Sequence, residues 1–148
     1  MALYKTLIAE GKQPVPTLND GLAGVIPFEY TTTASLAAND IIDLGPIEPG
    51  VSPLDVMLIA QDLDTNGTPT ITLSVGILNA AKDDIDGTAW IVESTVGQAG
   101  GVARATTNTC YLSGSSTSER RLGIKVVAGA ATGTGAGEKI AVLLTAKG

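Results

Sequence analysis

Residues 70–77, Thr-Ile-Thr-Leu-Ser-Val-Gly-Ile, alternate small or polar side chains with large apolar ones over the whole stretch. A period of two places Ile71, Leu73, Val75 and Ile77 on one face of an extended chain. β-Branched residues stand on both faces, as is common in strands. The stretch therefore predicts a strand that lays its apolar face on a core.

The same alternation returns in three other segments, residues 25–31, 121–126 and 139–145. Pro27 lies inside the first of them. It predicts an edge strand, because proline cannot donate a hydrogen bond to a neighbouring strand. Residues 54–60 are apolar on both faces apart from one aspartate, which predicts a strand buried between two layers.

Weaker patterns add to this set. Residues 40–44 form a short strand-like stretch, residues 103–112 alternate small and polar side chains, and residues 90–96 fit either a strand or a helical turn. Seven or eight strands result, without long helical segments between them. This order predicts an all-β, antiparallel β-sandwich or jelly-roll-like fold over residues 25–148.

Residues 1–24 are expected to form an extended N-terminal arm in front of that domain, because glycine and proline interrupt any regular element there. The arm also carries apolar side chains. These suit either the surface of their own domain or that of a neighbouring molecule, and the sequence leaves both open. As a partner interface, the predicted residues are Leu3, Tyr4, Leu7 and Ile8.

Composition limits the classes of partner. The chain has 148 residues, a net charge of −6 and 16% charged residues, against about 25% in a typical domain. An acidic chain is poorly suited to nucleic acid or to an anionic membrane surface. The N-terminus has no long apolar run of the kind found in signal peptides, and no run reaches the length of a membrane span. We therefore expect synthesis in a cytoplasm.

The sequence contains few residues that could serve in catalysis. The chain has no histidine and a single cysteine, Cys110, which excludes Ser-His and Cys-His nucleophiles and all histidine-containing metal sites. The glycine-rich stretch 97–101 lacks the Lys-Ser/Thr ending of a phosphate-binding loop. Arg120 and Arg121 are too few to form a nucleic-acid surface. We expect no enzymatic activity, no cofactor and no small-molecule substrate.

One stretch resembles half of a calcium loop. In Asp62-Leu-Asp-Thr-Asn-Gly67, the side chains of Asp62, Asp64 and Asn66 occupy the first, third and fifth positions. The twelfth position is Leu73 instead of glutamate, so an Asx-rich turn is the preferred interpretation and calcium the alternative. A second acidic turn, residues 83–86, would share a cation only if the fold placed it beside the first.

Three segments carry a resemblance to a known family: Asp-Leu-Asp-Thr-Asn-Gly-Thr-Pro-Thr-Ile-Thr-Leu-Ser-Val-Gly-Ile at 62–77, Ser-Thr-Val-Gly-Gln-Ala-Gly-Gly-Val-Ala-Arg at 94–104, and Asp-Ile-Ile-Asp-Leu-Gly at 40–45. Together they resemble small virion proteins of tailed bacteriophages, of the head decoration (cement) type. The resemblance covers roughly residues 30–146 and leaves the arm unmatched. It implies a β-sandwich without catalytic residues, a homotrimer that binds the major capsid protein on the outer capsid surface and bridges capsomers.

Two alternatives remain open. The chain could be another virion component of the tail, baseplate or head fibre. It could also be a carbohydrate-binding β-sandwich, which needs exposed aromatic side chains, and Trp90 and Tyr111 are the obvious candidates. The apolar neighbours of Trp90, Ile91 and Val92, favour a core position for it instead.

Overall fold

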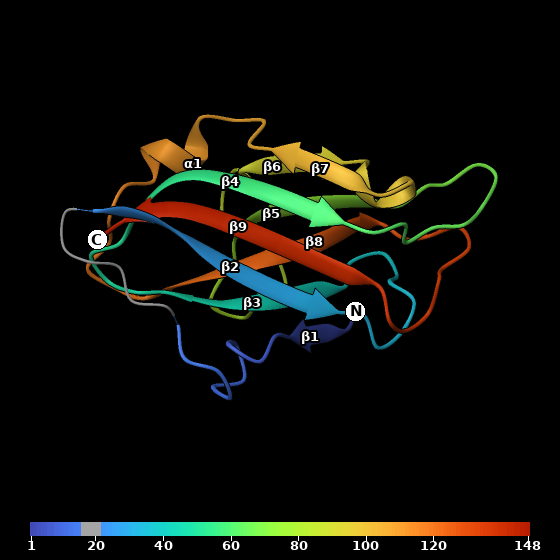
Figure 1. Cartoon of the computed structure of the whole chain (residues 1–148), viewed down its shortest axis with the longest axis horizontal. Helices are drawn as coiled ribbons and strands as arrows, with labels where there is room; N and C mark the ends of the chain where they lie inside the picture. The colour runs from blue at the N-terminus through green and yellow to red at the C-terminus, as the bar shows by residue number, and fades with distance from the viewer. Residues whose placement is uncertain (16–21) are drawn as a thin grey trace.

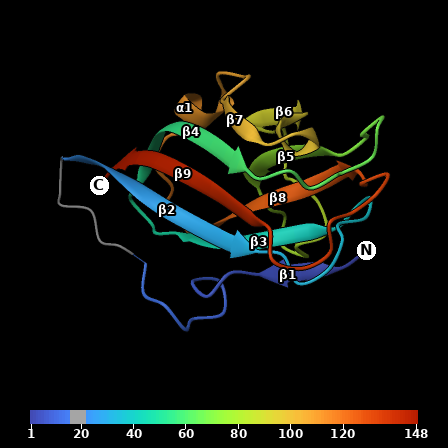
Figure 2. The same cartoon turned by 45° about the vertical axis from the view of Figure 1, so that its right-hand side comes forward.

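The computed structural model of the chain describes residues 1–15 and 22–148 (Figure 1). These residues form nine strands in two packed sheets, which confirms the predicted all-β sandwich. One of these strands, Leu3–Lys5, lies in the segment 1–24 that was expected to be an extended arm. The C-terminus lies near the left end of the molecule and the N-terminus toward its right side in both views (Figures 1 and 2). No helix in the described part of the chain is long and apolar enough to cross a membrane.

The first sheet has five strands in the order β1 (Leu3–Lys5), β3 (Ile41–Ile47), β8 (Arg120–Ala128), β5 (Thr72–Ile77), β6 (Ile91–Ser94). The second has four, in the order β2 (Ala23–Thr31), β9 (Lys139–Lys147), β4 (Ser52–Ala60), β7 (Gly101–Arg104). Neighbouring strands pair antiparallel except β1, which runs parallel to β3. A short 3₁₀-helix, η1 (Val96–Gln98), precedes β7, and a single-turn helix, α1 (Thr109–Leu112), follows it.

Alternating side chains of the long strands fill the space between the sheets, as the period of two predicts. The inward residues of β2, β8 and β9 are all buried: Ile26, Phe28, Tyr30, Leu122, Ile124, Val126, Ile140, Val142 and Leu144. Pro27 lies in β2, which is an edge strand, as expected. Trp90 is buried in the core beside β6, which confirms the core position predicted for it.

Two strand predictions differ from the structure, and a third segment, which fitted either a strand or a helical turn, contains both. β4 is buried on one face only, because its outward side chains Met57 and Ile59 are left half-exposed. The weak strand predicted at 103–112 is wrong beyond Arg104, where the chain leaves β7 and forms α1. The ambiguous segment 90–96 contains the strand β6 and leads into η1.

The outer side of the five-stranded sheet, here called the covered face, lies under residues 78–89 of the same chain. Gly123 of β8 makes this close approach possible, because a Cβ atom there would lie 2.5 Å from the side chain of Leu78. Lys82 and Asp84 of the segment form ion pairs with Asp43 and Lys125 of the sheet, at 3.4 and 2.8 Å. Glycine and paired charges therefore fasten the segment to the sheet.

Candidate functional site

The first nine residues lie on their own domain, at the edge of the five-stranded sheet (Figure 2). Backbone hydrogen bonds fix them there: the amide of Ile41 donates to the carbonyl of Ala2 at 2.8 Å, and the amide of Thr6 to the carbonyl of Asp43 at 3.1 Å. The amide of Ala2 donates to the carboxylate of Asp40 at 2.8 Å. The arm thus adds a strand to the sandwich, while residues 16–21 of the predicted arm lie outside the described residues.

Ile8 anchors the arm in the core. Its side chain is only 7% exposed. It packs over Gly45, whose φ of +144° favours glycine and where a Cβ atom would lie 2.7 Å from Ile8. The guanidinium of Arg121 adds a second attachment, since it donates to the carbonyl of Ala9 at 3.3 Å and to the carboxylate of Asp43 at 2.8 Å. Both contacts lie within one chain, so Ile8 serves its own fold in this structure.

The other three residues predicted for a partner interface differ in exposure. Tyr4 is half-buried, with its ring centroid 5.8 Å from that of Tyr30. Burial, then the charge of Asp40 and the proximity of Tyr30, raise the pKa of Tyr4. Leu3 and Leu7 are exposed, Leu7 by 56%. The arm therefore leaves Leu3 and Leu7 exposed and packs Tyr4 and Ile8 against its own domain.

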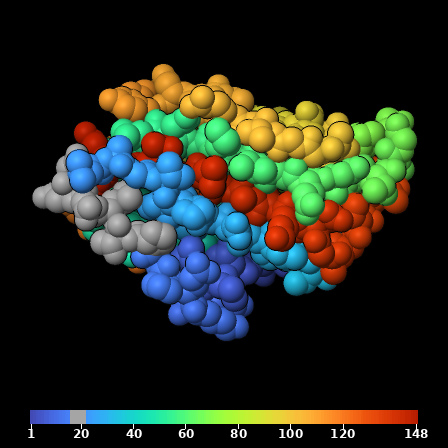
Figure 3. Space-filling model, viewed as in Figure 1, coloured from blue at the N-terminus to red at the C-terminus, as the bar shows by residue number. Residues whose placement is uncertain are grey.

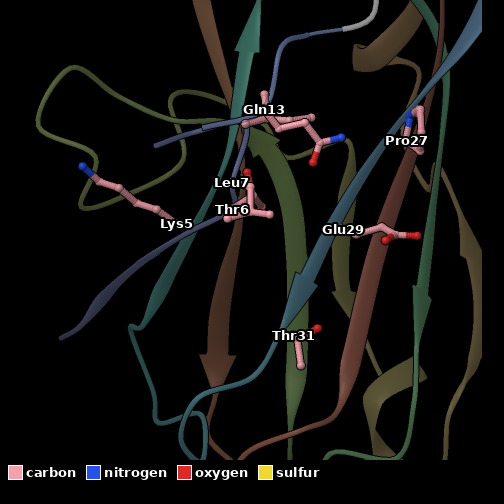
Figure 4. Close-up of a pocket in the computed structure, with 8 residues that line it drawn as sticks. Lys5, Thr6, Leu7, Gln13, Pro27, Glu29 and Thr31 are labelled. Atoms are coloured by element: carbon pink, nitrogen blue, oxygen red, sulfur yellow. The ribbon is translucent and has the colours of Figure 1, made fainter. Parts of the chain in front are cut away.

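A groove of about 500 Å³ separates the arm from strand β2 (Figure 4). Pro27, Glu29 and Thr31 line it from β2, and Figure 4 shows Thr6 and Leu7 on the side of the arm. Because β2 is the edge strand of its sheet, this groove follows the open side of the sandwich. Figure 3 shows the arm as a bulge that protrudes beneath that edge.

Asp64 organises the turn that resembles a calcium loop. Its carboxylate is buried and accepts five backbone N–H bonds, three on Oδ2 and two on Oδ1. The donors come from both sides of the turn and from the loop after β8: Asn66, Thr70, Ile71, Ala131 and Thr132. Burial alone would raise the pKa of Asp64, but these donors hold the pKa well below its usual range.

The remaining oxygens of the turn also bind backbone amides. Asp62 accepts from the amide of Asp64 at 3.0 Å, and Asn66 accepts from the amide of Thr68 at 2.9 Å. These are the contacts of an Asx-rich turn. In the described part of the chain, no three or more His, Cys, Asp or Glu side chains converge as a metal site would require, and the acidic turn at 83–86 lies on the covered face. The geometry thus favours the turn interpretation over calcium.

Cys110 and the aromatic residues offer little chemistry. Burial, with a further contribution from Asp55, raises the pKa of the Cys110 thiol to about 12, while Arg120 opposes the shift. The thiol is therefore protonated and unreactive at neutral pH. Trp90 is buried and cannot contribute to a sugar-binding platform, whereas Tyr111 is exposed.

The outer side of the four-stranded sheet, here called the bare face, is a surface that the sequence interpretation missed. No other described segment of the chain covers it, and Figure 3 shows the strands open to view. Strand register places an apolar group across all four strands: Val25, Pro27, Met57, Ile59, Val102, Ala141 and Leu143. The apolar outer side of residues 54–60 was the available sign, but it was taken to indicate burial within the chain.

Comparisons with known proteins give a consistent result. No protein-family model and no curated protein matches the chain. Two solved structures do. A chain of the capsid of Ralstonia phage GP4 is 39% identical, with a TM-score of 0.87 over 99% of both chains. A chain of the capsid asymmetric unit of cyanophage Pam1 is 29% identical, with a TM-score of 0.65 over 91% of this chain and 94% of that one.

Identity of 39% along nearly the whole length reaches well beyond a shared architecture, because the arm and every strand fall within the matched region. The two similar structures also come from the same kind of assembly, a phage capsid. The chain belongs to a family of phage capsid proteins, and its role is that of a structural component of a virion.

Proposed function

We propose that the chain is a head decoration, or cement, protein that binds the outer capsid surface as a homotrimer and bridges copies of the major capsid protein. The observation that carries the proposal is the 39% identity to a phage capsid chain over 99% of both chains. The absence of histidine, the protonated thiol of Cys110 and the backbone-bound carboxylate of Asp64 are consistent with a non-catalytic role.

The topology supports the same proposal. Strands β2-β9-β4-β7 face strands β3-β8-β5-β6, an interleaved order that we infer to be a jelly roll of two Greek keys. Such sandwiches recur in viral capsid and lectin domains. The lectin alternative needs an aromatic platform, and burial of Trp90 leaves Tyr111 as its main exposed ring.

The proposed mechanism is mechanical. Packaged DNA presses outward on an expanded capsid, and a protein that spans the joints between capsomers adds contact area there. A standard interface buries about 800 Å² on each partner, and repetition over the shell makes the attachment multivalent. Leu3 and Leu7, exposed on the arm beside a groove of about 500 Å³, are the residues we propose for the capsid contact.

Co-sedimentation with expanded heads that lack the protein tests this proposal. The wild type should pellet with the heads, and the Leu7→Asp variant should stay in the supernatant. Leu22→Asp, the same charge change at another exposed leucine, is the control and should pellet. A wild-type protein that ignores heads but binds purified tails would instead assign it to the tail or baseplate.

A further inference from the structure

The bare face has the composition of an interface core. Seven apolar residues form most of it; Glu29 and Arg104 lie on the outer strands, Lys139 and Lys147 at the ends of β9, and Asp55 of β4 is paired with Arg104. Cores of protein interfaces are depleted in charge and enriched in methionine, and Met57 lies near the middle of this face. A contiguous exposed apolar surface of this kind is unusual on a protein that works alone.

Charge distinguishes the bare face from the rest of the molecule. It carries three basic and two acidic side chains, a net +1, in a chain of net −6: Arg104, Lys139, Lys147, Glu29 and Asp55. Two copies of an acidic chain repel each other over most of their surfaces. The bare face is where a second copy can approach without that repulsion.

A second charge-poor surface adjoins the bare face. Residues 105–118, which include α1, contain no charged side chain. Within them Tyr111 is 64% and Leu112 68% exposed. Figure 1 looks onto the four-stranded sheet and shows α1 along its upper border, next to β4. This edge thus presents an exposed tyrosine, a residue type enriched at interface hot spots, beside an exposed leucine.

We infer that the bare face of one copy binds the α1 edge of a second copy, head to tail, and that repetition of this contact closes a small ring. The inference rests on the homotrimer proposed above and assigns its surfaces. A head-to-tail contact between opposite sides of a molecule runs on as a filament, whereas one between adjoining sides closes. If the outward directions of the two surfaces differ by about 60°, three copies close the ring; if they differ by about 90°, four copies do.

The size of the bare face explains why closure matters. At about 3.3 Å per residue and about 4.8 Å between strands, three nine-residue strands and one of four residues cover about 500 Å². A standard interface buries about 800 Å² on each partner, so one such contact is weak. In a ring each copy makes two contacts, so the closed ring is favoured over an open dimer.

Light scattering and sedimentation velocity on three variants test the assignment. Leu143→Asp places a charge in the centre of the bare face, and Tyr111→Asp places one on the α1 edge. The wild type should have three times the mass of the 14.9 kDa chain, and the Leu143 and Tyr111 variants should fall to a single chain. The control, Leu22→Asp, changes an exposed leucine outside both surfaces and should keep the wild-type mass.

Val102→Asp is a second variant on the bare face, in case Leu143→Asp fails to fold. Val102 is 60% exposed, so this variant should fold. It should give single chains with an unchanged circular dichroism spectrum. A wild-type dimer that Tyr111→Asp leaves intact would overturn the head-to-tail contact in favour of two bare faces packed together. A wild-type monomer would overturn the inference altogether. Binding to heads, measured separately, decides the decoration role, so a monomer that binds heads would refute the ring and the homotrimer but not that role.

Discussion

The outer faces of the two sheets differ in whether another segment of the chain covers them. Residues 78–89 cover the five-stranded sheet, where Leu78 lies on Gly123 and two ion pairs hold the segment in place. The four-stranded sheet has apolar residues on its outer side and is left open by the described residues. One chain therefore completes one face for its own stability, and on our proposal leaves the other for assembly. Matched substitutions on the two faces test this division.

Among matched substitutions on the two faces, those that break ion pairs should differ most in their effect on the free energy of unfolding. Arg121→Met leaves the fully buried carboxylate of Asp43 with Lys82 alone, at 3.4 Å. Breaking a buried pair from one side costs about 3–5 kcal/mol, so urea unfolding at pH 7 should show a loss of that size. Arg104→Met, which removes the exposed partner of Asp55 on the bare face, should cost at most about 1 kcal/mol. Equal losses would contradict the contrast.

Asp64 lies outside both faces, and its low pKa makes the stability of the folded protein sensitive to acid. Asp64→Asn should lower the urea midpoint more than Asp62→Asn, because Asp64 accepts five backbone N–H bonds and Asp62 only one. The low pKa of Asp64 in the folded state stabilises the protein above the unfolded pKa of about 3.9. That contribution is lost as the pH falls from this value toward the folded pKa.

The stability gap between wild type and Asp64→Asn should therefore be constant above about pH 5 and shrink below about pH 4. Urea unfolding of both proteins from pH 3 to pH 7 measures this gap. A gap that widens toward low pH would show that the carboxylate is not the stabilising form.

A larger side chain should lower the stability of the protein on the covered face and leave it nearly unchanged on the bare face. Gly123→Ala forces a methyl group against Leu78 and should cost about 1–3 kcal/mol in urea unfolding. Ala141→Val adds volume on the bare face, where no described segment packs above it, and should stay within about 0.5 kcal/mol of the wild type. A comparable loss at Ala141 would mean that the bare face is packed within the single chain.

The smallest effect on the single chain is expected at Val102. Val102→Ser removes an exposed apolar group, so unfolding at high dilution should change by less than about 0.5 kcal/mol. The assembled wild type should melt at higher temperature as its concentration rises, since association stabilises the folded state. Scanning calorimetry at two concentrations should show that the variant loses this dependence. A dependence as steep as that of the wild type would exclude Val102 from the contact.

Much of the fold follows from local patterns. The strict alternation at 70–77 and 121–126 depends only on which side of a strand faces the core. The edge position of Pro27 depends only on its missing N–H. The end of β7 was missed because residues 103–110 lack large apolar side chains, so their pattern is compatible with strand, turn and helix. The pairing of β1 with β3 depends on contacts across the whole chain, which no local period encodes.

The sites were predictable to a smaller extent. Three positions of the turn at 62–67 indicated an Asx-rich turn, but the loop that donates two of the five N–H bonds to Asp64 lies 67 and 68 residues away. The bare face was misinterpreted for a similar reason. Met57 and Ile59 make β4 apolar on both sides, and the sequence does not state whether their cover comes from the same chain or from another.

The central claim, that this protein strengthens a phage head, is tested most directly by the temperature at which heads release their DNA. Full heads that lack the protein are heated with a DNA-binding dye, either alone, after saturation with wild-type protein, or after incubation with the same amount of the Leu7→Asp variant. The account predicts that the wild type raises the release temperature and that the variant leaves it unchanged. Saturated binding of the wild type without any rise in that temperature would contradict it.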